Sequence, residues 1–231
     1  MGETIELKTR SGERFSGYLA RPASGTGPGV VVLQEIFGVN ANMRTVCDRL
    51  ADEGYAALAP DLFWRAAPGI ELDAATEAGR EQAMGLMKGL DQGGAVEDAL
   101  IAAEALAALP GATGKIGMVG YCLGGRLAFL TSMRPGIVAA VSYYGMIDSL
   151  LDRAGDIQCP VLLHIAEKDH LCPPEAQVAI HAALAQGPVE ILDYPGVGHA
   201  FARHGSPMRD DASADRADAA TLAFLARHLQ G

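Results

Sequence analysis

The stretch Gly117-Met118-Val119-Gly120-Tyr121-Cys122-Leu123-Gly124-Gly125 decides the fold. A strand-like run, 115–119, enters it and a helix-like run, 126–133, leaves it. This is the strand–turn–helix context of a nucleophile elbow, G-x-S-x-G, with cysteine in place of serine. Only residues without Cβ can flank such a strained turn closely, and a thiol at a helix N-terminus is favoured as the thiolate. The stretch therefore predicts a hydrolase that attacks with sulfur.

Around this elbow, predicted strands and helices alternate. The expected strands are 29–33, 55–59, 116–119, 138–143, 161–166 and 189–194, and the expected helices are 42–53, 75–90, 95–109, 123–133, 174–185 and 213–229. Residues 3–7 and 14–20 alternate polar and apolar around Ser11-Gly12, which predicts a β-hairpin. Gly93-Gly94 is expected to break the helical pattern. The alternation predicts an α/β fold with a mostly parallel sheet and helices on both faces. No linker divides the chain, so residues 1–231 are expected to form a single domain.

Composition excludes several classes of protein. The 231 residues are 49% hydrophobic and 20% charged, enough for one buried core. A net charge of −10 argues against nucleic acid or anionic membrane as a partner. The four cysteines include no C-x-x-C pair, and no other metal-ligand spacing appears. The first residues do not predict a signal peptide, and no apolar run predicts a membrane span. We therefore expect a reduced, cytoplasmic, monomeric protein without a bound metal.

Three candidate catalytic residues each follow a predicted strand. Cys122 follows 116–119, Asp169 follows 161–166 and His199 follows 189–194. The order nucleophile, acid, histidine is that of α/β-hydrolases. The thiolate would attack a carbonyl, the imidazole would move the proton, and the carboxylate would orient the imidazole. Backbone N–H groups of Leu123 and of the loop around Ile36 would stabilise the oxyanion. Taken alone, Asp169 could be a turn or cap residue, and five other histidines compete with His199.

Longer motifs resemble a known family. They are Gln34-Glu35-Ile36-Phe37-Gly38-Val39-Asn40, Pro60-Asp61-Leu62, Arg80-Glu81-Gln82-Ala83, Gly120-Tyr121-Cys122-Leu123-Gly124-Gly125, Tyr143-Tyr144-Gly145 and Gly198-His199-Ala200-Phe201-Ala202-Arg203. Together they resemble the dienelactone hydrolases, or carboxymethylenebutenolidases, through most of the chain. The resemblance implies an α/β-hydrolase fold, a triad of Cys122, His199 and Asp169, and no organic cofactor.

The resemblance also implies a substrate and a binding site. The family opens cyclic enol esters that carry a carboxylate, and Arg80 and Arg203 match the two arginines that bind it. Glu35 matches a glutamate that helps to form the thiolate when substrate binds. Further substrate-binding positions implied here are Tyr143, Phe37, Met84 and Trp64. Without the resemblance, Glu35 could be a cap or salt-bridge residue, Arg80 could pair with Glu77, Arg203 could be a surface loop charge and Trp64 could simply pack.

The chain departs from the family pattern in the expected pocket. Met84 and Met87 replace aromatic residues, and Ala200 replaces a serine. These changes leave room for an esterase or thioesterase with another small substrate. A different class of function, a non-catalytic binder or thiol redox sensor on the same fold, also remains open, because an activated thiol is easily oxidised.

Overall fold

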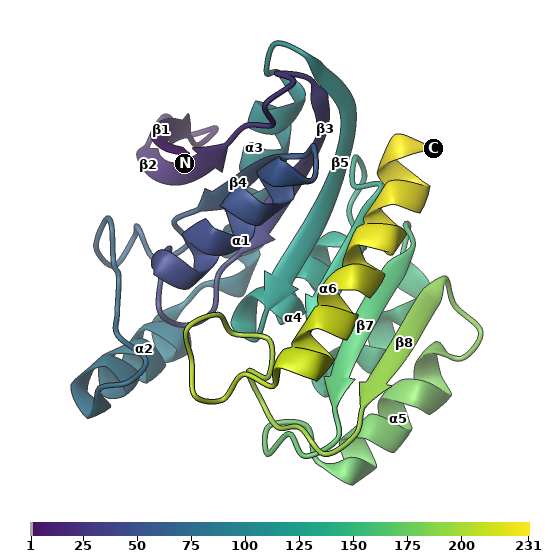
Figure 1. Cartoon of the computed structure of the whole chain (residues 1–231). Helices are drawn as coiled ribbons and strands as arrows, with labels where there is room; N and C mark the ends of the chain where they lie inside the picture. The colour runs from purple at the N-terminus through teal and green to yellow at the C-terminus, as the bar shows by residue number, and fades with distance from the viewer. Residues whose placement is uncertain (1) are drawn as a thin grey trace. The chain divides into compact units, whose positions relative to one another are not determined.

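The structure is a computed structural model that describes residues 2–231. The chain divides into two compact units, Met1–Ile116 and Gly117–Gly231. The division falls within strand β5 (Ala112–Tyr121), which begins in the first unit and ends in the second (Figure 1).

The first unit contains the predicted hairpin and the first parallel strand pair. Its strands are β1 (Glu3–Lys8), β2 (Arg14–Ala20), β3 (Gly27–Leu33) and β4 (Ala56–Pro60), in the spatial order β1-β2-β4-β3. β1 and β2 are antiparallel, β2 and β4 are antiparallel, and β3 and β4 are parallel. The Thr9 N–H donates to the Glu13 carbonyl at 2.8 Å and closes the hairpin, which confirms the prediction.

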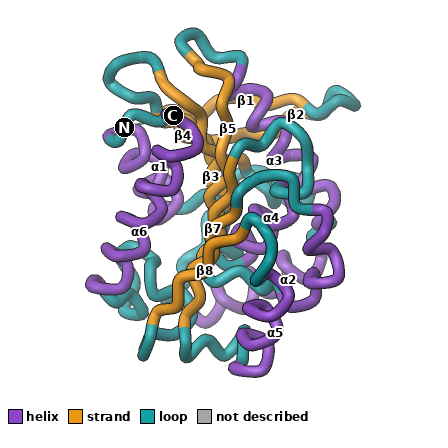
Figure 2. Tube along the Cα trace, turned by 90° about the vertical axis from the view of Figure 1, so that its right-hand side faces the viewer, coloured by secondary structure: helices purple, strands orange, loops and turns teal. Residues whose placement is uncertain are grey.

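Helices cover both faces of β3 and β4. They are α1 (Ala41–Asp52) on one face and α3 (Gln92–Ala107) on the other (Figure 2), and α2 (Glu77–Gly89) lies between them in sequence. Because both faces are covered, the residues Val30 to Leu33 are completely buried. The predicted break between two helices is present, but it lies at Leu90-Asp91 and not at Gly93-Gly94. Asp91 is the N-cap of α3 and accepts from the Gly93 N–H, so both glycines lie in the first turn of that helix.

The second unit contains only parallel strand pairs. Its strands are the end of β5, then β6 (Ala139–Tyr143), β7 (Val161–Ala166) and β8 (Val189–Tyr194), in that spatial order. Helices α4 (Leu123–Thr131) and α5 (Pro174–Leu184) cover one face and α6 (Asp211–Leu225) covers the other (Figure 2). A 3₁₀ helix at Asp148–Asp156 and a final π turn at Ala226–Gln230 were not predicted. Since the strands are parallel, their carboxyl ends meet at one edge.

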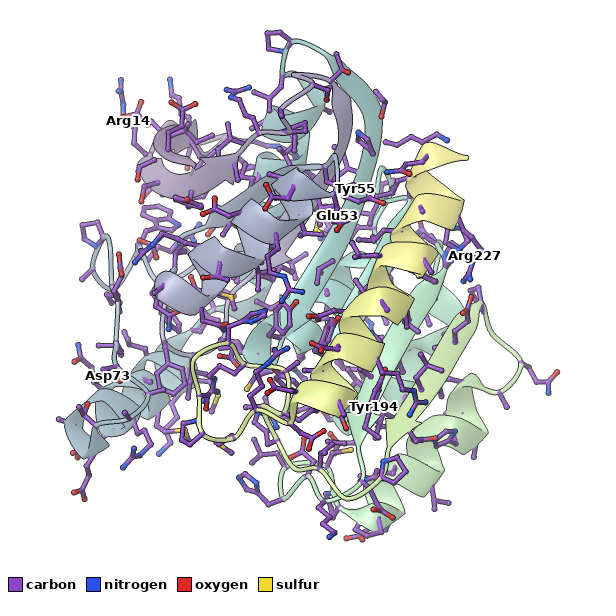
Figure 3. The ribbon with its side chains drawn as sticks, in the orientation of Figure 1. Arg14, Glu53, Tyr55, Asp73, Tyr194 and Arg227 are labelled. Atoms are coloured by element: carbon purple, nitrogen blue, oxygen red, sulfur yellow. The ribbon has the colours of Figure 1, made fainter. Side chains whose placement is uncertain are left out.

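A buried polar network fixes α6 against this sheet. His164 of β7 hydrogen-bonds to the Tyr194 hydroxyl at 2.8 Å and to the Thr221 hydroxyl at 2.9 Å. The Tyr143 hydroxyl bonds to Thr221 at 2.7 Å and donates to Asp218 at 3.1 Å. Tyr194 lies beside the first turns of α6 (Figure 3). Burial lowers the pKa of His164 to about 3, so this imidazole is neutral. The network therefore fixes the helix that follows the loop bearing His199.

Candidate active site

Cys122 occupies a strained elbow between β5 and α4. Its backbone has φ 54° and ψ −115°, a conformation that residues other than glycine rarely adopt. The Cys122 N–H donates to the Tyr143 carbonyl at 3.0 Å. A Cβ on Gly120 would lie 1.9 Å from the carbonyl oxygen of Gly124, so this position accepts only glycine. Leu123 is the first residue of α4, and its backbone N–H is at the helix N-terminus as expected.

Asp169 and His199 are joined by a hydrogen bond at the ends of β7 and β8. The Nδ1 of His199 lies 2.8 Å from Oδ2 of Asp169, and both side chains are buried. The second oxygen of Asp169 accepts from the Leu171 N–H at 2.9 Å, which fixes the carboxylate. The two loops are also tied together, because the Gly196 N–H donates to Glu167 at 2.7 Å.

The imidazole of His199 interacts with both other members of the candidate triad. Burial disfavours its charged form, but the hydrogen bond with Asp169 and the charge interactions with Cys122 and Asp169 outweigh that effect and raise the pKa of His199 to about 10. Its Nε2 is buried, and within residues 2–231 no contact of this atom has the full distance and angles of an ordinary hydrogen bond. The interaction between Cys122 and the imidazole is therefore electrostatic. The arrangement favours an imidazolium beside sulfur at neutral pH.

Two aromatic rings beside His199 were not singled out from the sequence. The edge of the Tyr144 ring meets the His199 ring at a centroid distance of 5.0 Å, and the exposed His170 ring lies 5.9 Å away. Tyr144 has φ 40°, and its N–H donates to the His164 carbonyl at 2.9 Å. The sequence signal that could have indicated Tyr144 was its position directly after a buried strand.

The predicted substrate residue Tyr143 lies in the core of the second unit. It is fully buried, its ring stacks on Tyr121 at 4.5 Å, and its hydroxyl points to α6. This position follows from the period of two along a strand, which turns Tyr143 into the layer of α6. Arg203 is half-buried, and its N–H donates to the Ala200 carbonyl at 3.0 Å in the loop after His199.

The first unit holds the predicted residues that follow β3. Glu35 is only 1% exposed, and Asn42 donates to its Oε2 at the long distance of 3.5 Å. Ile36 and Phe37 form the next turn, in which Ile36 is half-buried and Phe37 is buried.

Arg80 and Met84 lie on α2 and are exposed. The Nη1 of Arg80 donates to the carbonyls of Ala74 and Ala75, both at 2.9 Å, and no ion pair joins it to Glu77 among the described residues. Met84 is 41% exposed.

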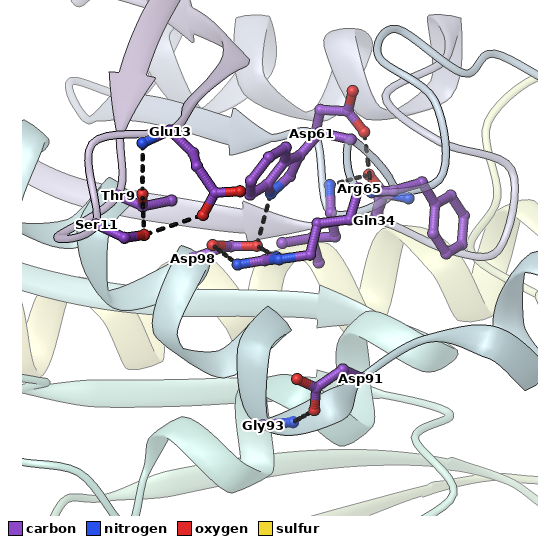
Figure 4. A network of polar contacts seen from close by, with 12 residues as sticks. Thr9, Ser11, Glu13, Gln34, Asp61, Arg65, Asp91, Gly93 and Asp98 are labelled. Carbon is purple, nitrogen blue, oxygen red and sulfur yellow. Dashed lines mark hydrogen bonds and ion pairs between the residues drawn. The ribbon is translucent and has the colours of Figure 1, made fainter.

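Trp64 belongs to a network of packing and polar contacts. Its Nε1 donates to Asp98 at 2.9 Å, and its ring stacks on Phe15 at 5.5 Å. Arg65 forms an ion pair with the same fully buried carboxylate (Figure 4), and its guanidinium lies 4.2 Å from the centre of the Trp64 ring. These contacts fix the indole and account for its place in the fold.

No cluster of three metal-binding side chains occurs within residues 2–231. Over the same residues, no helix has the length and hydrophobicity needed to cross a membrane.

Comparison with known proteins gives a consistent result. The family described as "Dienelactone hydrolase family" matches residues 15–229. Carboxymethylenebutenolidase 1 of Cupriavidus pinatubonensis is 37% identical, with 98% of this chain and 97% of the relative covered. A putative carboxymethylenebutenolidase of Azospirillum brasilense is 42% identical, over 93% of this chain and 94% of the relative.

Solved structures agree. A putative dienelactone hydrolase from Klebsiella pneumoniae superposes with a TM-score of 0.85 at 30% identity, covering 99% of this chain and 100% of that one. A dienelactone hydrolase-like promiscuous phosphotriesterase from metagenomic libraries has a TM-score of 0.78 at 25% identity, with 99% of both chains covered. The α/β-hydrolase fold predicted from the sequence is confirmed.

Proposed function

This chain belongs to the dienelactone hydrolase family and is a carboxylic ester hydrolase, and on that premise we propose that it opens carboxylate-bearing enol lactones through a thioester on Cys122. His199 and Asp169 complete the proposed triad. The observation that carries this proposal is the position of His199, bonded to Asp169 at 2.8 Å and with its pKa raised by both Asp169 and Cys122.

The reaction has two steps. The sulfur of Cys122 attacks the lactone carbonyl carbon, the ring C–O bond breaks, and the ring oxygen leaves as an enolate that takes up a proton. The resulting thioester is then attacked by water, which releases the second carboxylate and restores the thiol. Neither step needs an oxidant or a cofactor, because only acyl and proton transfers occur.

The charge state of His199 changes between these steps. Before acylation, the sulfur and Asp169 both favour the imidazolium, as the raised pKa indicates. Once the sulfur is acylated it carries no charge, so one of these two favourable partners is lost and the pKa of His199 falls. The neutral imidazole can then accept a proton from the attacking water. The same side chain therefore stabilises the nucleophile first and serves as the base second.

Two backbone N–H groups would stabilise the oxyanion. One belongs to Leu123, at the N-terminus of α4, and we assign the other to Ile36, in the turn after β3. Glu35 would interact with the resting thiol and assist its ionisation when substrate binds. Its burial supports this role, because a carboxylate shielded from water interacts strongly with its neighbours.

Arg80 and Arg203 would bind the carboxylate of the substrate. A guanidinium presents paired N–H donors in the geometry of a carboxylate. The two carbonyls that Arg80 already contacts use only Nη1, so Nε and Nη2 have no partner among the described residues. Phe37 and Met84 would contribute apolar contacts.

The test compares a carboxylate-bearing enol lactone with its neutral methyl ester. Cys122→Ala should abolish turnover of both. Arg80→Ala and Arg203→Ala should raise the KM of the carboxylated lactone and leave the methyl ester unaffected. Arg153→Ala is the control, since Arg153 is an exposed arginine paired with Asp156. Equal rates in the wild type and Cys122→Ala would reject the mechanism.

A second candidate is an esterase or thioesterase without a carboxylate requirement. The exposure of Met84 and the engagement of the Arg80 Nη1 with the backbone favour it. Turnover that survives Arg80→Ala unchanged on all substrates would support this second function. A thiol redox sensor, the third possibility, predicts stoichiometric oxidation of Cys122 by peroxide and no ester turnover by freshly reduced protein.

We further propose that both units form one domain and that the chain works as a cytoplasmic monomer. The four cysteines are free thiols, as expected in a reducing compartment, and β5 runs from one unit into the other. Light scattering of the purified protein should give the mass of one chain. Unfolding should show a single cooperative transition.

A further inference from the structure

The turn that carries the proposed oxyanion donor Ile36 is held at both ends by one distant segment. At its start, the side-chain Oε1 of Gln34 accepts from the Leu62 N–H at 3.1 Å. At its end, the Phe37 carbonyl accepts from the Leu72 N–H at 2.9 Å, and Gly38 forms an isolated bridge with Glu71. Ile36 lies between these two attachments.

The contact at Gly38 is a direct approach of two backbones. Gly38 has φ +79°, and a Cβ on it would lie 1.8 Å from the Ile70 carbonyl oxygen. No other residue could be accommodated without moving one of the two segments. The close approach is therefore part of how this turn is built.

The carboxylate of Asp61 closes the distant segment into a loop. One oxygen accepts from the Phe63 N–H at 3.0 Å and the other from the Gly69 N–H at 2.8 Å. Asp61 is buried, and these two bonds compensate for its loss of water. Closure fixes the separation between Leu62, which is one attachment point of the turn, and Ile70, which directly precedes the other at Glu71 and Leu72.

A second anchor holds the interior of this loop. Trp64 and Arg65 both bind Asp98 of α3, so the loop cannot shift as a whole when it meets the turn. The Asp61 loop is thus fixed to the helix layer on one side and to the Ile36 turn on the other.

We propose that Asp61 is a positioning residue for acyl transfer, which sets the direction of the Ile36 N–H by closing the loop that grips its turn. The inference deepens the proposed function and rests on it. An oxyanion donor works only when it points within a narrow angle at the developing charge. An N–H between two fixed attachments keeps that direction, whereas one in a turn released at either end does not.

The test separates oxyanion stabilisation from the rest of the site. Asp61→Asn keeps one acceptor and loses the other, so the loop opens partly. We expect kcat for the lactone to fall about 10- to 100-fold with KM changed less than about threefold. Alkylation of Cys122 by iodoacetamide should keep the wild-type rate, because displacement of iodide at saturated carbon forms no oxyanion.

A second variant does not depend on Asp61. Gln34→Met removes the acceptor for the Leu62 N–H but also removes Nε2, a buried amide nitrogen without a partner among the described residues. Its melting temperature should stay close to that of the wild type while kcat falls. If Asp61→Asn does not fold, this variant decides the question.

The matched control is Asp91→Asn. Asp91 also accepts a backbone N–H, from Gly93 at 3.0 Å, but this bond caps α3 and involves no residue of the Ile36 turn. Asp91→Asn should lower the melting temperature and leave kcat unchanged. Wild-type kcat in Asp61→Asn, or a parallel loss of kcat and alkylation, would overturn the inference. A wild-type protein that alkylates normally but does not open the lactone would instead reject the proposed function.

Discussion

Replacing Asp169 by asparagine tests the proposed triad with little disturbance of the fold. Asparagine keeps an oxygen that can accept from the Leu171 N–H, now bonded to Asp169 at 2.9 Å. Its amide would take the place of the oxygen that lies 2.8 Å from Nδ1 of His199. An amide donates to Nδ1, which forces the ring proton onto Nε2. The imidazole then cannot accept a proton from the thiol or from water.

The pKa of His199 gives the size of the effect. It lies at about 10 instead of 6.5, because Asp169 and Cys122 together outweigh the cost of burial. A shift of this size favours the imidazolium by about 3,000-fold, or about 5 kcal/mol, and removing Asp169 loses a large part of it. Loss of the correct tautomer in a triad lowers kcat by a similar factor, about 10⁴. We therefore expect kcat/KM near neutral pH to fall by about 10³- to 10⁴-fold.

Two assays measure this change. Initial rates of lactone opening give kcat/KM, and intact-mass measurement of iodoacetamide adducts gives the rate of Cys122 alkylation between pH 5 and 10. At neutral pH the variant should be alkylated more slowly than the wild type, because it loses the Asp169 carboxylate that favours the imidazolium beside Cys122. Asp193→Asn is the control, because Asp193 also bonds a histidine, His181, at 3.1 Å but on the surface. If Asp169→Asn retained both profiles within about threefold of the wild type, the triad would be refuted.

Three further predictions concern stability. The pKa of His164 is about 3 in the folded protein against 6.5 unfolded, so the unfolded state binds an extra proton as the pH falls from 6.5 towards 3. The free energy of unfolding should therefore fall over this window, by about 2 kcal/mol at pH 5. Urea unfolding should show a smaller fall with pH in His164→Asn than in the wild type. Equal falls in the two proteins would contradict this. Gly120→Ala, whose Cβ would meet Gly124 at 1.9 Å, should cost about 2–3 kcal/mol and slow Cys122 alkylation. Gly155→Ala, with nothing within 4 Å, should do neither. Asp98→Ala leaves the Trp64 indole and Arg65 unpaired and should cost about 2–4 kcal/mol in thermal unfolding, and a change under 0.5 kcal/mol would show that the network contributes little.

Features with a local cause were predictable from the sequence. The hairpin, the parallel strands and the elbow each depend on a short pattern, and the structure contains all three. The order of Cys122, Asp169 and His199 along the chain predicts that they lie at one edge of the sheet, because parallel strands bring their carboxyl ends to one edge. The hydrogen bond between Asp169 and His199 agrees with that expectation.

Features that depend on distant partners were not predictable. Gly93 and Gly94 begin α3 because the Asp91 side chain caps it, although glycine usually interrupts helices. Tyr144, directly after β6, has φ 40° and contacts His199, and the sequence pattern does not indicate this backbone conformation. Trp64 looked like a pocket residue, but its partner Asp98 lies on a helix far along the chain. Contacts of this kind cannot be predicted from a single sequence.

The backbone strain in this protein supports a functional interpretation of the second unit. Among residues 2–231, the non-glycine residues with positive φ are Cys122, Tyr144 and Ala200. Each such conformation costs about 1–2 kcal/mol, which glycine would avoid. Cys122 carries the proposed nucleophile, Tyr144 contacts the His199 ring, and Ala200 directly follows His199. Strain of this kind persists where the surrounding structure enforces it, and it concentrates at active sites. Its restriction to the immediate neighbours of one imidazole is therefore an argument, independent of sequence motifs, that the chemistry takes place there.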